Sequence, residues 1–449
     1  MIKIIIYPVV IFFMCSCGVK KTTSTSYNNQ SSQKSLESEY NSNDRYNLER
    51  FRNIKSSKLR VYKDNFEKAQ NAFFLDNWRL AIYYLNIVIS SREDADAYFM
   101  RAYSKSNISD YDGAVSDYLK AINLRPSFVF AYNNLASVKY NYFKIVKSSI
   151  NDLKKAISYD DNAPLLFANL AIIQIFDESY EKAISNATKA INLGSEKIYD
   201  VYYTRGKAKR LFDRFDEAIT DLKRSLDYKY DNPKSHFELG IAYFDLEKYD
   251  ESITSYTNAI RYSSTDDTFP VHIAYENRAI AKNLNKDFLG SISDFNKSNE
   301  LHSETNINNK AKIGKVHFSW GGELFEDNSW VLAIEQFKIA KDLNPSLQEK
   351  SNYNIASSYI NLSNKFISED SKIVLQMNSL GTSPSDNIKY SKLKKQRERN
   401  FLNELKYLLL AYEHDKKRKS LLKSISEIYK ILGDTENYIF FKGKAENIN

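Results

Sequence analysis

The stretch Asp110–Pro126 reads DYDGAVSDYLKAINLRP, and related stretches recur along most of the chain. In seven of eight copies an aromatic residue stands three positions before a small residue, and in all eight an aliphatic residue follows the small one. The small residues of the eight copies are Ala81, Ala114, Ser149, Ala183, Ala218, Ser252, Ser291 and Ala333. Their spacings are 33, 35, 34, 35, 34, 39 and 42 residues. A period of about 34 residues indicates an array in which each repeat is one supersecondary unit.

The first half of each repeat is marked by a further small residue. This second mark lies twelve positions before the small residue named above in every copy except the third, where Ala136 lies thirteen positions before Ser149. Both marks lie within apolar patterns of helical period, which predicts two helices joined by a tight turn. We expect the helices to approach closely at the small residues, because a bulky side chain there would overpack the contact.

These repeats resemble the tetratricopeptide repeat family, whose pattern runs W-x2-L-G-x2-Y, then A-x3-F, then P. The sixth copy shows it in Leu239, Gly240, Tyr243, Tyr249 and Tyr256. The leading tryptophan is mostly replaced by another aromatic residue or His. The resemblance covers roughly Lys63–Ser346. It implies an all-α, right-handed superhelical solenoid of antiparallel helix pairs, with a concave groove for a protein or peptide.

Composition agrees with a helical array. The 449 residues include only 12 Gly and 7 Pro, so helix breakers are scarce. The hydrophobic content of 43% leaves ample apolar surface to bury. A solenoid also grows without splitting its core into separate domains. We therefore expect the repeats to span residues 59–346.

Residues 1–17 are predicted to be a leader. Lys3 precedes the apolar run Ile4–Phe13, which is too short to span a bilayer and fits an export signal. The following Met14–Gly18, MCSCG, resembles the lipobox of bacterial lipoproteins. That resemblance implies cleavage before Cys17 and acylation of Cys17, including a palmitate-type chain. An ordinary leader with incidental cysteines is the alternative.

Residues 18–58 are rich in Ser, Thr, Asn and charge, a composition that cannot bury enough apolar surface to order. We expect them to be a disordered tether. With an acylated Cys17, the chain would be exported and anchored to a membrane without spanning it. Gly18 follows Cys17 where an Asp would favour the inner membrane in enteric bacteria. The expected location is therefore the cell envelope, at the outer membrane.

Residues 347–449 are expected to hold degenerate repeat-like helices. A first helix is predicted at Gln348–Leu362, and a Ser/Asn-rich insertion at 363–387 delays its partner, which is predicted from about Ile388 to Lys417. A last pair, at Ser420–Leu432 and Thr435–Glu446, would serve as the cap that a solenoid needs.

The densest charge in the chain is a basic run that begins at Lys389 and ends at Arg399. One interpretation is contact with anionic lipid or an acidic partner, and the other is the solvated face of a long helix. The run lacks a recognised nucleic-acid motif, and an exported protein seldom meets nucleic acid, so no nucleic-acid partner is expected.

No catalytic or cofactor motif is apparent. The five histidines are scattered without metal-ligand spacing, and no phosphate-binding glycine loop is present. The acidic pairs fall in turns, where carboxylates commonly cap helices. We therefore expect no enzyme activity, no metal site and no small-molecule cofactor.

The family resemblance places the first helices on the concave face, with residues three before and one and four after the small residue pointing inward. The groove residues implied in this way are Phe99, Tyr103, Asn133, Tyr140, Ile172, Ile175, Tyr203, Lys207, Arg210, Phe237, Phe244 and Asn283. Aromatic and Arg side chains are common anchors for protein partners. The alternative is that many of these side chains pack between neighbouring repeats. The Lys/Asn carboxylate clamp of co-chaperone relatives is absent.

The leading functional hypothesis is a non-enzymatic scaffold that binds a protein partner of the cell envelope, as a lipid-anchored component of a secretion or assembly complex. An alternative is a surface lipoprotein that captures a ligand such as a glycan for a transporter. The regularity of the repeats argues against this alternative. An enzyme with its site in the 363–387 insertion ranks last, because the insertion lacks His, Cys and Arg.

Overall fold

The computed structural model describes residues 57–302 and 306–448. Within these residues the regular structure is entirely helical, with twenty α-helices and two short 3-10 turns. The predicted all-α class and the helix pairs are therefore confirmed. The leader, Cys17 and nearly all of the 18–58 tether lie outside the described residues.

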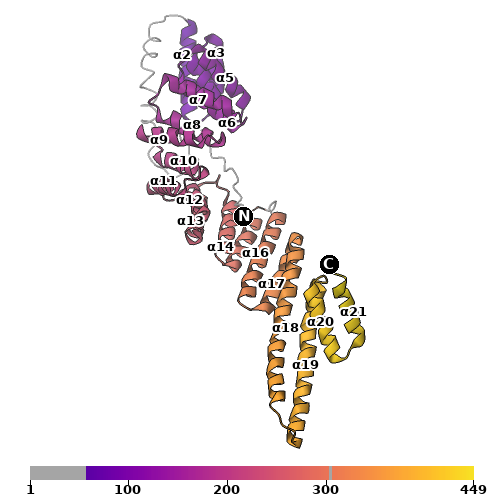
Figure 1. Ribbon diagram of the computed structural model, residues 1–449. Helices are drawn as coiled ribbons and strands as arrows, with labels where there is room; N and C mark the ends of the chain where they lie inside the picture. The colour runs from indigo at the N-terminus through magenta and orange to yellow at the C-terminus, as the bar shows by residue number, and fades with distance from the viewer. Residues whose placement is uncertain (1–56, 303–305, 449) are drawn as a thin grey trace. The chain divides into compact units, whose positions relative to one another are not determined.

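The chain divides into two compact units (Figure 1). The N-terminal unit comprises, in its described part, residues 57–246 and 264–269. Its helices are α2 (Ser57–Phe74), α3 (Trp78–Ser91), α4 (Ala95–Asn107), α5 (Tyr111–Leu124), α6 (Val129–Asn141), α7 (Val146–Tyr159), α8 (Pro164–Phe176), α9 (Tyr180–Asn192), α10 (Ile198–Leu211), α11 (Phe215–Tyr228) and α12 (Pro233–Asp245). Consecutive pairs from α2/α3 to α10/α11 stack on one another.

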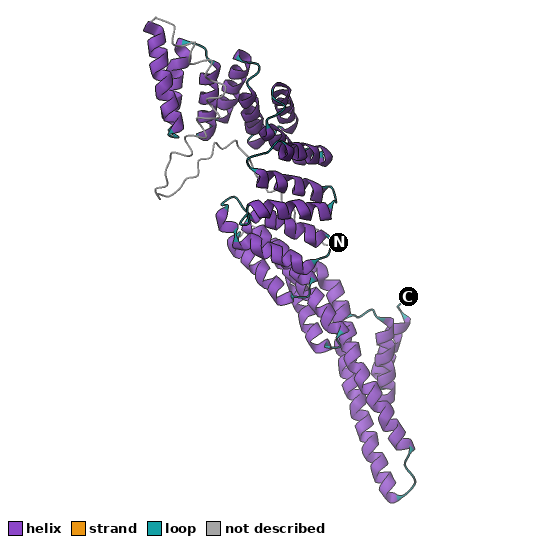
Figure 2. Cartoon of the chain, turned by 90° about the vertical axis from the view of Figure 1, so that its left-hand side faces the viewer, coloured by secondary structure: helices purple, strands orange, loops and turns teal. Residues whose placement is uncertain are grey.

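The C-terminal unit comprises residues 247–263 and the described residues from Pro270 onward. Its helices are α13 (Tyr249–Arg261), α14 (Val271–Leu284), α15 (Phe288–Leu301), α16 (Asn306–Glu326), α17 (Trp330–Leu343), α18 (Gln348–Asn378), α19 (Pro384–His414), α20 (Lys419–Leu432) and α21 (Thr435–Glu446). Figure 2 shows that α18 and α19 are much longer than their neighbours.

The small residues lie where the two helices of a repeat meet. The small residues of the eight second helices, from Ala81 to Ala333, are completely buried. A Cβ atom at Gly206 would lie 2.9 Å from Cγ of Leu222 and 3.2 Å from the carbonyl oxygen of Ala218. The predicted close approach is therefore confirmed, and at Gly206 it leaves no room even for a methyl group.

The turn between the two helices of a repeat has one conformation throughout the array. Its central residue lies five positions before the small residue of the second helix. The φ of this central residue is between 56° and 67° in all eight copies, yet none of the eight is Gly. These residues are Asp76, Ser109, Lys144, Glu178, Asp213, Glu247, Lys286 and Asn328. In the fourth copy the amide of Ser179 donates to the carbonyl of Gln174 at 2.9 Å, which closes the end of the first helix.

A buried ion cluster ties three helices together in several repeats. Arg101 of α4 grips Asp117 of α5 with two nitrogens, at 2.8 and 2.6 Å, and Lys105 lies 2.9 Å from the same carboxylate. The remaining nitrogen of Arg101 donates to Asn86 of the preceding helix α3 at 2.8 Å. We call this arrangement the Arg–Lys–Asp clamp, and its bidentate geometry is the strongest form of an ion pair.

The clamp recurs with the same spacing, Lys at four and Asp at sixteen residues after Arg. The further copies are Arg205–Lys209–Asp221 and Arg278–Lys282–Asp294. The third repeat keeps only Lys139 and Asp152, at 2.7 Å, and the fourth replaces the pair with a neutral hydrogen bond from Asn186 to Gln174. This pattern was not predicted, although its fixed spacing is visible in the sequence.

The sequence predicts that the first helix ends near Leu362, before a Ser/Asn-rich insertion at 363–387, and this predicted end is wrong. Helix α18 continues to Asn378, and α19 begins at Pro384. The serine hydroxyls donate to backbone carbonyls of their own helix, as in Ser363 to Ile360 at 2.7 Å. No Gly or Pro interrupts the segment before Gly381, and packing against α19 buries Ile373. The extra residues therefore extend a helical hairpin.

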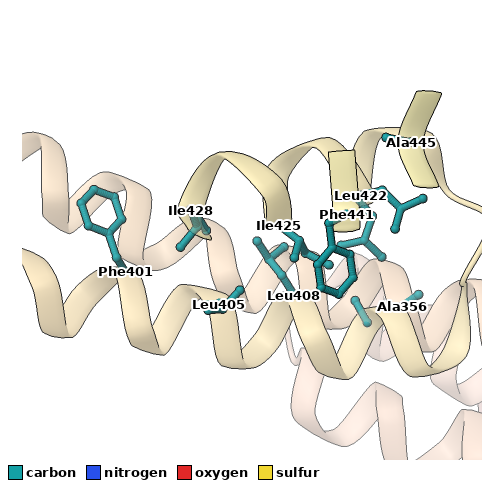
Figure 3. Close-up of a cluster of buried hydrophobic side chains, with 11 residues drawn as sticks. Ala356, Phe401, Leu405, Leu408, Leu422, Ile425, Ile428, Phe441 and Ala445 are labelled. Atoms are coloured by element: carbon teal, nitrogen blue, oxygen red, sulfur yellow. The ribbon is translucent and has the colours of Figure 1, made fainter. Parts of the chain in front are cut away.

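The predicted C-terminal pair is confirmed as α20 and α21, which turn at Gly433 with a φ of 79°. Figure 3 shows how Leu422 and Ile425 of α20 pack with Leu408 of α19 and Phe441 of α21. This cluster covers the apolar side of α19, as expected of the terminal pair of a solenoid.

The turn conformation yields a stability prediction. Glu178→Gly should raise the free energy of unfolding by about 0.5–1 kcal/mol, because glycine adopts positive φ without the strain of a Cβ atom. The control Lys182→Gly, on the exposed face of α9, should lower it by about 1 kcal/mol. Urea denaturation of the three proteins measures both effects, and a loss of stability in Glu178→Gly would contradict the prediction.

The clamp yields a second prediction. Asp221→Ala should lower the free energy of unfolding by about 2–4 kcal/mol, because it leaves Arg205 and Lys209 largely buried without their carboxylate. The control is Asp227→Ala on the same helix, which removes a carboxylate that is 62% exposed in a 3.5 Å pair. It should change stability by less than about 0.5 kcal/mol. Equal losses in the two variants would mean that the clamp contributes nothing specific.

Candidate functional site

The twelve residues predicted to face the groove all lie on first helices. Eleven of them belong to the N-terminal unit, on α4, α6, α8, α10 and α12, whereas Asn283 lies on α14 of the C-terminal unit. We describe the eleven as the first-helix surface of the N-terminal unit.

Several aromatic residues of this surface contact the adjacent repeat. The ring centroid of Phe99 is 4.9 Å from that of Phe128, at the start of the next repeat. Tyr103 lies 5.3 Å from Phe73 of α2, across the first helices of two repeats. Tyr140 of α6 lies 5.2 Å from Phe176 of α8, and burial raises the pKa of its hydroxyl. These side chains thus join neighbouring first helices.

Burial divides the twelve residues into two groups. Seven are buried: Asn133, Tyr140, Ile175, Tyr203, Arg210, Phe237 and Asn283. Five are half-buried: Phe99, Tyr103, Ile172, Lys207 and Phe244. The buried group packs within and between repeats, as the alternative interpretation of the sequence proposed for many of the twelve. The half-buried group keeps part of its surface open to solvent.

Lys207 and Arg210 of α10 meet Glu238 of α12 at the centre of the surface. Lys207 lies 3.1 Å from Oε1 of Glu238, and Nε of Arg210 donates to Oε2 at 2.8 Å. Burial alone would raise the pKa of Glu238, but Arg210 and Lys207 hold it below its ordinary value. The positive charge of Lys207 and Arg210 is therefore partly neutralised.

Glu238 was missed because it lies 28 residues after Arg210, in the next repeat. It occupies the position two before the first-helix small residue, and the polar residues at this position are buried in five successive first helices. They are Asn134, Asn169, Thr204, Glu238 and Asn277. A run of polar residues at one repeat position could have indicated an internal polar row. In that row Asn169 donates to Asn133 of the preceding first helix at 2.8 Å.

The segment Ser264–Phe269 covers one side of α12. Asp266 lies 2.7 Å from Lys234, and the hydroxyl of Thr265 donates to the carbonyl of Asp231 at 3.0 Å. Phe269 packs against Phe237, with ring centroids 5.8 Å apart. This segment therefore buries part of the first-helix surface.

Within the described residues, no group of three or more His, Cys, Asp or Glu side chains could hold a metal ion. His272 and His302 stack with ring centroids 4.5 Å apart, and burial together with His302 lowers the pKa of His272. No described helix is long and apolar enough to cross a membrane. The first-helix surface offers apolar, hydrogen-bonding and charged contacts, which suit the recognition of another polypeptide.

Regular helix pairs, close-packed through small residues, define an α-helical repeat protein of the protein-interaction scaffold class. Two segments, 95–128 and 233–266, match the tetratricopeptide repeat family model. The chain is also 26% identical over 263 residues to TPR repeat-containing protein MJ1428 of Methanocaldococcus jannaschii. The chain therefore contains repeats of the tetratricopeptide type.

The similarity to MJ1428 involves 57% of this chain and 41% of that protein, so the chain spans less than half of its relative. Among solved structures, PilW, a type IV pilus biogenesis factor, is 13% identical with a TM-score of 0.43, covering 46% of this chain and 92% of PilW. YrrB, described as having an unusual peptide-binding site, is 17% identical with a TM-score of 0.34, covering 41% of this chain and 92% of YrrB.

The buried carboxylate of Glu238 yields a prediction with a pH signature. Glu238→Gln should destabilise the protein by about 2–4 kcal/mol at neutral pH, because Lys207 and Arg210 lose their counter-charge. The lowered pKa means that the stabilisation is present above the ordinary value of 4.5 and is lost as pH falls through the folded-state value. The difference in melting temperature from wild type should therefore shrink below about pH 4.

A matched control for this measurement is Glu181→Gln, which removes an exposed carboxylate of α9. Its melting temperature should follow that of the wild type at every pH. A Glu238→Gln difference that stays constant from pH 7 to acid would show that the carboxylate charge is not the cause.

Proposed function

We propose that this protein is a non-enzymatic scaffold that binds a protein partner through the first-helix surface of the N-terminal unit. It acts at the cell envelope as a lipid-anchored component of a secretion or assembly complex. The observation that carries the proposal is the regular array of tetratricopeptide repeats, a family whose members bind proteins and peptides.

The surface itself suggests how the partner is held. The buried aromatic and polar residues keep neighbouring first helices in register, so the surface is formed before binding and little ordering is needed. Half-buried Ile172 and Phe244 then provide apolar area. Lys207 and Arg210 together carry one more positive charge than Glu238 offsets. A partner with an apolar side chain next to an acidic group would satisfy both.

The proposed anchor is Cys17, which lies outside the described residues and is argued from its lipobox-like context alone. Acyl chains on Cys17 would hold the chain at a membrane, and the Ser/Thr/Asn-rich residues 18–58 would let the array reach its partner. About forty flexible residues span roughly 35 Å on average.

The test is affinity purification of the tagged protein from gently solubilised envelopes of its own organism, with identification of partners by mass spectrometry. The double variant Ile172→Ala and Phe244→Ala should lose a partner by at least about tenfold, because it removes contact area without touching the buried residues. The control pair Tyr83→Ala and Leu119→Ala truncates exposed side chains of second helices, 59% and 49% accessible, and should retain the partner.

Two results would contradict the proposal. Equal recovery of the partner with both double variants would exclude the first-helix surface as the binding site. Release of Cys17→Ala into the soluble fraction is expected if Cys17 is the anchor, and unchanged membrane association would refute the acyl anchor. Saturable binding of an oligosaccharide instead of a protein would favour the ligand-capturing alternative.

A further inference from the structure

The α18–α19 hairpin is the largest departure from the repeat plan. Each helix has 31 residues, against 13 or 14 in the two helices of most pairs. Its two helices hold together through Phe366 and Tyr407, whose rings stack 5.9 Å apart, and through an ion pair between Asp370 and Arg397 at 2.9 Å. Figures 1 and 2 both show the joined end of the hairpin extending beyond α20 and α21.

Large apolar side chains lie exposed at this joined end, which we call the hairpin tip (residues 371–399). Leu375 of α18 is 70% exposed and Ile388 of α19 is 73% exposed. Tyr390, two residues further on, is 47% exposed. Scattered surface leucines are ordinary, but these three flank one short loop at the free end of a projecting element.

The hairpin tip is also strongly basic. It contains seven Lys and Arg residues but only two Asp and Glu residues. The exposed cations are Lys372, Lys389, Lys392, Lys394, Lys395 and Arg399. Among the described residues, the seventh, Arg397, is the only cation of the tip in an ion pair. In the three clamps, by contrast, each Arg and Lys lies against an aspartate.

The order of these groups along the hairpin is that of an interfacial segment. Ile388 precedes the cations of α19, which extend about 16 Å along the helix to Arg399. The exposed apolar side chains and Tyr390 at the hairpin tip suit the boundary between headgroups and acyl chains. The cations further along α19 suit contact with anionic headgroups.

The angular spread of the cations favours a membrane over a protein. Lys392, Lys395 and Arg399 share one stripe of α19, since they recur at intervals of three and four residues. Lys389, three residues before Lys392, borders this stripe, whereas Lys394 lies on the other side of the helix and Lys372 is on α18. A single docked helix would neutralise one stripe, whereas mobile anionic headgroups can surround a projecting tip on several sides.

We propose that the tip of the α18–α19 hairpin docks on an anionic membrane surface, with Leu375 and Ile388 entering the interface and the surrounding lysines and arginine contacting headgroups. The contact is separate from the proposed anchor at Cys17 and does not depend on it.

The experiment uses the full chain with Cys17→Ser, expressed without acylation, so that any binding arises from the protein surface. Co-sedimentation compares vesicles of pure phosphatidylcholine with vesicles containing about one-third phosphatidylglycerol. Binding should occur on the anionic vesicles and fall steeply with salt, because the Debye length shortens from about 10 Å at 0.1 M to about 3 Å at 1 M.

The triple variant Lys392→Gln, Lys395→Gln and Arg399→Gln should weaken partitioning onto anionic vesicles by roughly 30- to 100-fold. The control replaces three exposed lysines of second helices in the N-terminal unit with Gln: Lys147, Lys154 and Lys182. It loses the same net charge and should bind within about twofold of the parent. Leu375→Ser with Ile388→Ser should weaken binding at high salt more than at low salt, because it removes the apolar contribution.

Circular dichroism melts establish that each variant is folded, and the exposed positions make a folding defect unexpected. The proposal is overturned by equal binding to neutral and anionic vesicles, by no binding to either, or by equal loss in the tip and control variants. Failure of vesicle binding, with capture of an acidic protein that the triple variant loses, would replace the membrane with a protein partner. Neither result would affect the partner-binding test of the first-helix surface.

Discussion

The close contact between the two helices of each repeat is the constraint on which the rest of the structure depends. At Gly206 an added Cβ would lie within 2.9 Å of Leu222, and at Gly321 within 2.8 Å of the Phe337 ring. Close-packed interiors do not absorb such an overlap without displacement, so the small residues fix where the helices meet. Because the contact recurs at a nearly constant interval, one local geometry propagates along each unit as a solenoid.

The same close contact also constrains the turns and the ion pairs of the repeats. The turn after each first helix must reverse the chain within a few residues, and the protein accepts a non-glycine residue at positive φ in all eight copies. Ion pairs that pass between helices are largely buried, so their geometry must be good to offset desolvation. The bidentate grip of Arg101, Arg205 and Arg278 on their aspartates meets that requirement. In the third and fourth repeats, which lack the arginine, a Lys–Asp pair and an amide hydrogen bond occupy the same positions.

The same packing explains why several residues that were expected to face the groove are buried. Side chains such as Tyr140 and Arg210 reach the neighbouring first helix and become part of the scaffold. Other residues of the surface, including Lys207 and Phe244, stay partly open to solvent. The α18–α19 hairpin has the opposite character, since its tip leaves the stack, exposes Leu375 and Ile388, and among the described residues has only one cation, Arg397, in an ion pair.

The sequence by itself determined the helix pairs, their order and the positions of closest contact, because these follow from local periodicity and from small residues repeated in phase. It also predicted the terminal pair α20 and α21. Only the tertiary structure decided that Glu238 neutralises Lys207 and Arg210, since residues 28 to 31 apart meet only when two repeats stack. Only it decided that 363–378 is helical, because serine-rich residues there gain a helix through packing against α19. Contacts within a repeat can be predicted from the local sequence, whereas contacts between repeats depend on how the stacked helices are spaced.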